Sequence, residues 1–175
     1  MRIKETETYL NNFAKYVIQQ SRSNLTKGDK NVDKKLYNSL DKEVEVGANS
    51  FRLAFEMEDY GQFQDKGVKG KTSSTKAPNS PFKFGSGTGE KGGLTKGIDK
   101  WVKKRRIQFK DKKSGKFLSY QSTAFLITRS IYHKGIKPSL FFTKPFNKAF
   151  ERLPEELVEA YGLDVENFIE FTLNK

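Results

Sequence analysis

The stretch that decides the fold is EVEVGANSFRLAFEME, residues 43–58. In residues 43–46 glutamates alternate with valines, and in residues 51–58 large apolar side chains alternate with small or charged ones. Alternation with a period of two is typical of strands that bury one face, and GANS, residues 47–50, supplies turn residues between them. The stretch therefore predicts an antiparallel β-hairpin that forms the sheet of an α+β domain.

Two helices are predicted ahead of this hairpin. Residues 6–21 form an amphipathic pattern, because apolar side chains recur at the three- and four-residue spacing of one helical face. The members of that face are Leu10, Phe13, Ala14, Val17 and Ile18. Asn31 is predicted to cap a second, short helix, whose apolar residues are Leu36, Tyr37 and Leu40.

After the hairpin, residues 67–93 are rich in Gly, Ser, Thr, Lys and Pro. Such a long connection without a periodic pattern predicts a flexible arm. Helical patterns follow over residues 94–107 and 122–132, and a turn or short hairpin is expected around Ser114 and Gly115. The apolar content of residues 122–132 is enough to bury most of that helix, and Gly135 is expected to stop it.

The last part of the chain is predicted to be helical as well. Pro154 can open a helix at its first turn, and Gly162 is expected to end that helix. Residues 164–175 fit either a helix or a strand, and we favour a helix. The fold prediction is thus an α+β domain over residues 1–153, with the N-terminal helix and the 122–132 helix packed on the sheet, followed by a C-terminal helical extension, residues 154–175.

Composition limits the classes of function. The chain has 175 residues, of which 33 are Lys or Arg and 21 are Asp or Glu, so the net charge is +12. This excess favours an anionic partner such as nucleic acid, a membrane surface or an acidic protein, although a merely soluble basic protein remains open. There is no cysteine and one histidine, His133, which argues against a thiolate metal site and most zinc schemes. No signal-peptide pattern or bilayer-spanning run is present, so we expect a cytoplasmic protein with no membrane partner.

Two patterns are of a kind found in enzymes. Gly70-Lys71-Thr72 resembles the end of a phosphate-binding P-loop, but Asp65 stands where the first glycine is required and no helix pattern follows. A carboxylate group, Glu56, Glu58, Asp59 and Asp65, could hold magnesium for a nuclease, but a solvated strand face also explains its first members. We therefore expect no enzyme activity, no cofactor and no metal.

The basic segment KGIDKWVKKRRIQFKDKKSGK, residues 96–116, is the strongest indication of a binding surface. Its central cations are Lys103, Lys104, Arg105 and Arg106. They would neutralise phosphates without reading sequence, or contact an acidic partner. Trp101 could stack on bases or belong to the core. A charged outer face of the helix remains an alternative.

Two short segments resemble a known family. They are YGQFQDKG, residues 60–67, and GIKPSLFFTKPFNKAFERL, residues 135–153. With the preceding helix, hairpin and Gly-rich loop, they resemble the tail-completion, or head–tail connector, proteins of tailed bacteriophages. The matching positions are Tyr60, Phe63, Asp65, Gly67, Gly135, Pro138, Phe141, Phe142 and Pro145. Residues 94–120 and the part after Pro154 are longer than is usual in that family.

The resemblance implies a structural role. Members of that family form rings of identical subunits around the DNA channel between the portal and the tail, and the matching positions serve folding and assembly. It implies portal, connector and tail proteins as partners, the virion neck or tail as location, and the host cytoplasm during assembly. The arm 67–93 would then order on docking with a neighbour. The rival functions are a stand-alone, non-sequence-specific nucleic-acid-binding protein and, less favoured, a metal-dependent nuclease.

Overall fold

The computed structural model describes residues 3–28, 33–47, 50–86 and 93–173. The chain divides into two compact units, each treated separately below. The first unit contains residues 1–61 and 140–175, and the second unit contains residues 62–139. Mixed helices and small antiparallel sheets make up the fold, so the predicted α+β class is confirmed.

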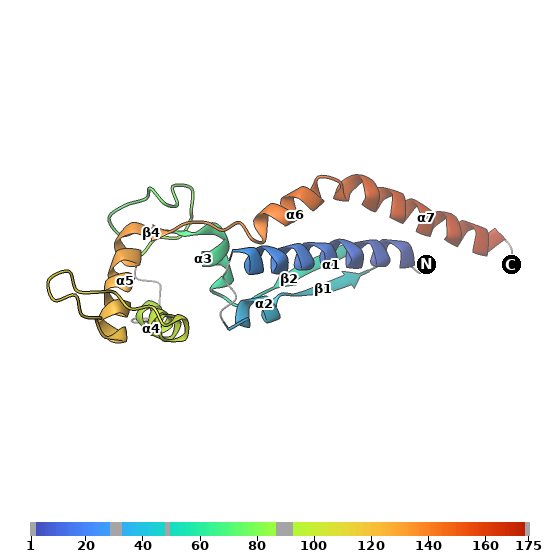
Figure 1. Cartoon of the computed structure of the whole chain (residues 1–175). Coiled ribbons are helices and arrows are strands. Elements are labelled where there is room, and N and C mark those ends of the chain that lie inside the picture. The colour runs from blue at the N-terminus through green and yellow to red at the C-terminus, as the bar shows by residue number, and fades with distance from the viewer. Residues whose placement is uncertain (1–2, 29–32, 48–49, 87–92, 174–175) are drawn as a thin grey trace. The chain divides into compact units, whose positions relative to one another are not determined.

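The first unit is built on the predicted hairpin (Figure 1). Strands β1, Asp41–Val46, and β2, Phe51–Glu56, pair antiparallel, with Val44 opposite Leu53 and Val46 opposite Phe51. This register puts the apolar side chains of both strands on one face, as the alternation predicts. The face is half-buried rather than buried, and the long helix α1, Lys4–Lys27, packs against it.

Helix α1 buries the apolar stripe that its sequence predicts. Its buried side chains include Leu10, Phe13, Ala14, Val17 and Ile18. The C-terminal part of α1 lies beside α2, Lys35–Ser39, and the two helices share a core cluster. That cluster consists of Ile18, Leu25, Leu36, Leu40 and Phe141. The proposed cap Asn31 lies outside the described residues.

The hairpin is also contacted by α6, Thr143–Phe150, a helix that the sequence analysis did not place there. The ring of Phe55 on β2 lies edge-on to Phe142 at 5.2 Å and to Phe146 at 5.9 Å between centroids. Helix α5, Tyr120–Lys134, belongs to the second unit, where it packs on α4, Gly93–Arg105. Apolar content identified α5 as a helix, but could not say which surface it contacts.

Helix α7, Leu153–Leu173, begins where the C-terminal extension was expected and packs along α1. The prediction that Gly162 ends a helix is wrong, because α7 continues through it, and the preference for helix over strand after residue 164 is confirmed. Buried Ala160 and Asp164 hold this part of the helix on α1, and their packing overrides the poor helix propensity of glycine.

The second unit contains a small sheet and a helical pair. Strand β3, Val68–Lys69, follows the short helix α3, Gly61–Lys66, and pairs antiparallel with β4, Gly135–Ile136. The predicted turn at Ser114 and Gly115 is present as a hairpin closed by the Lys110–Phe117 bridge. The expectation that α5 is mostly buried is wrong: only Thr123 and Ala124 of its side chains are buried.

Residues 67–86, the larger part of the predicted flexible arm, form backbone hydrogen bonds within the second unit. The amide of Lys69 donates to Phe82 at 2.8 Å, and the amide of Phe84 donates back to Lys69 at 2.9 Å. The buried hydroxyl of Ser80 donates to the carbonyl of Gly67 at 2.8 Å. These bonds give this part of the arm a defined conformation within the second unit. The remaining glycine-rich part, residues 87–92, lies outside the described residues.

Candidate functional site

The two segments that resemble the connector family lie against each other beside the β3–β4 pair, in which β3 directly follows the first segment. Val68 pairs with Ile136 and Lys69 pairs with Gly135. In α3, which precedes β3, the carbonyl of Gln64 accepts hydrogen bonds from the amide of Ser139 at 3.2 Å and from the hydroxyl of Ser139 at 2.6 Å. Segments separated by about seventy residues therefore form one junction within the second unit.

Glycine is required at this junction for steric reasons. Gly135 has φ 84°, and a Cβ built there would lie 2.3 Å from the carbonyl oxygen of Val68. Gly67 has φ 71°, and its Cβ would lie 2.5 Å from the oxygen of Ile136 and 2.7 Å from the nitrogen of Pro138. A side chain at either position would push the strands apart. Gly67, Gly135 and Pro138 thus have a structural role in joining the two segments.

The other resemblance positions are divided between the units. In the second unit, Phe63 lies edge-on to Phe82 at 4.7 Å, and Asp65 is buried. In the first unit, Phe141 and Pro145 are buried and Phe142 belongs to the aromatic cluster around Phe55. These contacts give the positions packing roles within their own units.

Tyr60 is the one aromatic of the first segment that lies in the first unit, where its side chain is partly exposed. Partial burial raises its pKa, and the nearby carboxylates of Asp33 and Glu58 raise it further. Lys35 and a backbone hydrogen bond with Leu36 act in the opposite direction without cancelling the effect. The phenol is therefore protonated at neutral pH, and nothing in this arrangement activates it as a nucleophile.

The charge is divided unequally between the units. The second unit carries 19 Lys and Arg against 4 Asp and Glu, a net charge of +15. The first unit carries 14 against 17, a net charge of −3, and the two values give the +12 of the chain. Only the net charge of the whole chain can be calculated from the sequence, because the charge of each unit depends on where the fold divides the chain.

The basic segment occupies the end of α4 and the hairpin after it. Lys103, Lys104 and Arg105 form the last turn of α4, as predicted, where cations are favoured by the helix dipole. Lys103 is paired with Asp99 at 2.6 Å. Arg106 follows the helix with a positive φ of 54°, so the chain turns sharply there. Trp101 is partly exposed, so its side chain is neither fully within the core nor fully available to stack on bases.

The hairpin after α4 carries further cations of the same basic segment. Asp111 stabilises the turn of this hairpin, because its carboxylate accepts hydrogen bonds from the amides of Ser114 at 2.7 Å and Lys113 at 3.0 Å. Those hydrogen bonds, with one from the Ser114 hydroxyl, lower the pKa of Asp111. Lys112, Lys113 and Lys116 are exposed beside it.

Large apolar side chains are exposed in the same unit. Phe117 on the hairpin is 64% exposed, with the ammonium of Lys110 at 5.0 Å from its ring centroid. On α5, Phe125 is 59% exposed, and with Leu126 it lines a shallow hollow next to Gln121 and Ser122. Cations interleaved with exposed rings suit phosphate contact with base stacking, or an acidic protein surface with apolar anchors.

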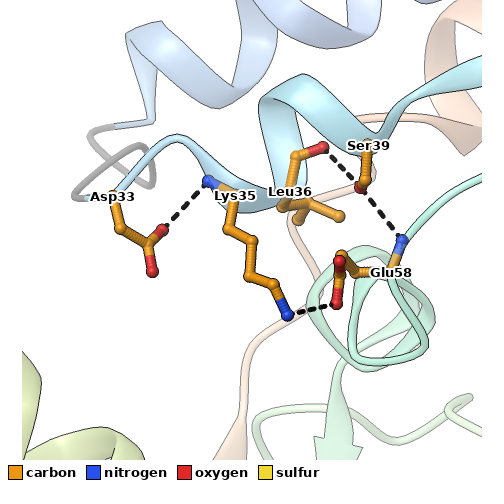
Figure 2. Close-up of polar contacts among 5 residues, drawn as sticks. All are labelled: Asp33, Lys35, Leu36, Ser39 and Glu58. Carbon is orange, nitrogen blue, oxygen red and sulfur yellow. Dashed lines mark hydrogen bonds and ion pairs between the residues drawn. The ribbon is translucent and has the colours of Figure 1, made fainter.

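Of the four carboxylates considered for magnesium, Glu58 is held in an ion pair. Glu58 forms an ion pair with the ammonium of Lys35 at 2.8 Å, and its backbone amide donates to the Ser39 hydroxyl at 3.0 Å (Figure 2). Ser39 in turn donates to the carbonyl of Leu36. Asp65 lies in the other unit. Within the described residues, no three His, Cys, Asp or Glu side chains group closely enough to hold a metal ion.

The Gly70-Lys71-Thr72 stretch has no free amides to offer a phosphate. The amide of Gly70 donates to Ser73, that of Lys71 to Tyr132 and that of Thr72 to His133. A Cβ at Gly70 would lie 2.0 Å from the carbonyl oxygen of His133, so this glycine allows the loop to lie against the end of α5. The loop is thus held by the protein backbone, in agreement with the rejection of a P-loop.

Comparison with known proteins adds no family assignment: no family model, curated protein or solved structure matches the chain. Among the helices in the described parts of the chain, none combines the length and apolar character needed to cross a bilayer.

Proposed function

We propose that this chain is a structural protein of a tailed-phage virion, which forms an oligomeric ring at the head–tail junction around the DNA channel. The observation that carries the proposal is the junction beside the β3–β4 pair, where Gly67 of the first segment lies against Ile136 and Pro138 of the second, and the carbonyl of Gln64 accepts hydrogen bonds from Ser139. Two short motifs that resemble one family are better support when they meet in one structural feature than when they are unrelated in space.

The unequal charge supports a place beside DNA. A unit with a net charge of +15 would attract the phosphate backbone without sequence preference, as a channel lining must. The first unit, with a net charge of −3, would provide contacts between proteins. On this proposal the partners are identical subunits and the portal, connector and tail proteins, and the chain assembles from the host cytoplasm into the virion neck or tail.

The proposal includes no catalysis and no cofactor. Its support is that the groups considered for chemistry have structural partners: Glu58 with Lys35, and the amides of residues 70–72 with backbone carbonyls.

The proposal is tested by the solution mass of the full chain, measured by sedimentation velocity, alone and mixed with portal and tail components. We expect closed rings of defined mass in at least one of these mixtures. A chain that stays monomeric and joins no ring in any mixture would rule the proposal out.

A second candidate function is nucleic-acid binding by the chain acting alone. It is favoured by the exposed lysines and rings of the hairpin and α5, and it needs no ring. It predicts affinity for duplex or single-stranded DNA that falls steeply with added salt. Monomers that bind DNA tightly while no mixture yields rings would favour this candidate over the virion protein.

A metal-dependent nuclease is the least supported alternative, because the carboxylate of Glu58 is paired with the ammonium of Lys35. It predicts magnesium-dependent DNA cleavage that Glu58→Ala or Asp59→Ala abolishes. Pure protein that leaves DNA intact in magnesium excludes it.

A further inference from the structure

Helix α7 continues beyond the helix on which it packs. Asp164 accepts hydrogen bonds from the amides of Glu5 and Thr6, at the first turn of α1, so the residues after it run past the start of α1 (Figure 1). In this final part Phe168 is exposed and Ile169 is 51% exposed. Nearer the start of α7, Val158 is 72% exposed.

These side chains form a regular stripe along α7. Val158, Tyr161, Val165 and Phe168 alternate at spacings of three and four, which places them along one side of a helix, and Ile169 adjoins them. We name these five residues the α7 seam. Tyr161 contacts Phe51 edge-on at 5.8 Å, at the margin of the first unit, Val165 is half-buried, and Val158 and Ile169 are exposed.

The α7 seam is flanked by acidic side chains. Residues 153–173 contain six Asp or Glu and no Lys or Arg, and four of the acids recur on one flank of the seam. Those four are Glu155, Glu159, Glu166 and Glu170. Pairing two α7 seams would bring like charges together, whereas an apolar seam with an acidic flank suits a basic surface with apolar anchors.

A surface of that kind is present in the second unit. The amide of Phe109 donates to the hydroxyl of Thr123 at 3.2 Å, which ties the hairpin to α5. Both elements carry exposed apolar side chains and cations, which we group under the name α5–hairpin face; on α5, Phe125, Leu126 and Arg129 lie on one side, three and four residues apart. Its members are Lys110, Lys116, Phe117, Phe125, Leu126 and Arg129.

We propose that the α7 seam of one copy docks on the α5–hairpin face of a second copy. The two surfaces are complementary in charge, and both expose large apolar side chains of the kind that mark interaction sites. Because the seam and the face are different surfaces, each copy carries one of each, and the contact repeats from copy to copy. A repeated contact of this type closes into a ring when its rotation allows. The inference rests on the proposed ring and identifies its interface.

Two full-length variants test the contact. The seam variant carries Val158→Ser and Ile169→Ser, and the face variant carries Phe125→Ser and Leu126→Ser. We expect each variant alone to lose self-association by at least about tenfold, because each loses the burial of two large apolar side chains. Mixed in equal amounts, they retain one intact seam and one intact face, so we expect a dimer of one copy of each and nothing larger, by sedimentation velocity.

A matched control keeps the test specific. Leu163 is also on α7 and is 47% exposed, but it lies off the seam, so Leu163→Ser should associate as the unchanged chain does. Circular dichroism and melting temperature show whether each variant folds. As a second measurement, Glu166→Lys with Glu170→Lys should weaken association, and Lys110→Glu with Lys116→Glu on the other copy should restore it in the mixture.

The outcomes separate this inference from the proposed function. Rings that persist in both variants would overturn the inference and leave the ring proposal standing. Self-association of the face variant alone, lost in the seam variant, would mean that two seams pair with each other, and would also overturn it. A chain that remains monomeric, with or without portal and tail components, would overturn both proposals.

Discussion

The carboxylate of Asp164 holds the start of α1 through Thr6, accepting from its amide at 2.9 Å and from its hydroxyl at 2.8 Å. The same carboxylate accepts from the amide of Glu5 at 2.9 Å. The first amides of a helix have no partner within the helix, and here a side chain from the last helix supplies one. Both Asp164 and Thr6 are buried, so this contact fastens α7 to α1 across 158 positions of sequence.

Asp164→Ala should therefore destabilise the first unit. The change leaves two amides and the Thr6 hydroxyl without their acceptor in a buried place, and we expect a loss of about 2 kcal/mol in the free energy of unfolding. Denaturation by urea measures it. Glu166→Ala, on the exposed side of the same helix, is the control and should change stability by less than about 0.5 kcal/mol. Equal effects of the two changes would contradict this role for Asp164.

The same carboxylate predicts a dependence on pH. Burial alone would raise the pKa of Asp164, but the hydrogen bonds from Thr6, Glu5 and Lys4 outweigh burial and lower the pKa below its ordinary 3.8. The unfolded chain then takes up this proton at a higher pH than the folded chain does. The stabilisation is complete above about pH 3.8 and is lost as the pH falls through the lower folded pKa. Between about pH 2 and pH 5, stability should fall less steeply in Asp164→Asn than in the unchanged chain; parallel slopes would refute this.

Two glycines should respond oppositely to replacement by alanine. At Gly135 the new Cβ would lie 2.3 Å from the oxygen of Val68 with φ at 84°, so Gly135→Ala should destabilise the second unit by at least about 2 kcal/mol. At Gly162 nothing lies within 4 Å of the new Cβ, so Gly162→Ala should stabilise α7 by up to about 1 kcal/mol. Thermal unfolding of both variants measures the difference, and a stabilising Gly135→Ala would contradict the β3–β4 junction.

Contact with DNA should depend on the end of α4. Changing Lys103, Lys104, Arg105 and Arg106 to Gln should weaken DNA binding and make the plot of log affinity against log salt shallower by up to about 4. The control removes four lysines of the first unit, by changing Lys4, Lys15, Lys34 and Lys148 to Gln. Affinity that falls equally in both sets would mean that net charge alone, rather than the second unit, attracts DNA.

Local pattern was sufficient for much of the fold. The hairpin and α1 were predicted because alternation and helical spacing each specify which face of one element is apolar. The same reasoning misjudged α5, since an apolar side chain such as Phe125 has the same pattern whether it is buried or exposed for a partner. The predicted helix end at Gly162 was wrong because the helix propensity of one residue contributes little free energy. The packing of Ala160 and Asp164 on α1 outweighs it.

The candidate surfaces depended on information that a sequence pattern does not hold. The KKRR run was visible, but the +15 charge of the second unit required its boundaries at residues 62 and 139. The α7 seam could have been predicted from the sequence, because its three- and four-residue spacing runs from Val158 to Phe168. It was missed because a helix end was expected at Gly162, in the middle of that pattern. Nothing near Asp164 indicates a partner 158 positions away, so its capping role required the structure.

The central claim, a ring of identical subunits, is tested most directly by native mass spectrometry of the full chain, alone and with portal and tail components. The account predicts one dominant species at an integral multiple of the chain mass, seen as a closed ring with a central channel by electron microscopy. A single-chain mass in every mixture, with no ring in the images, would contradict it.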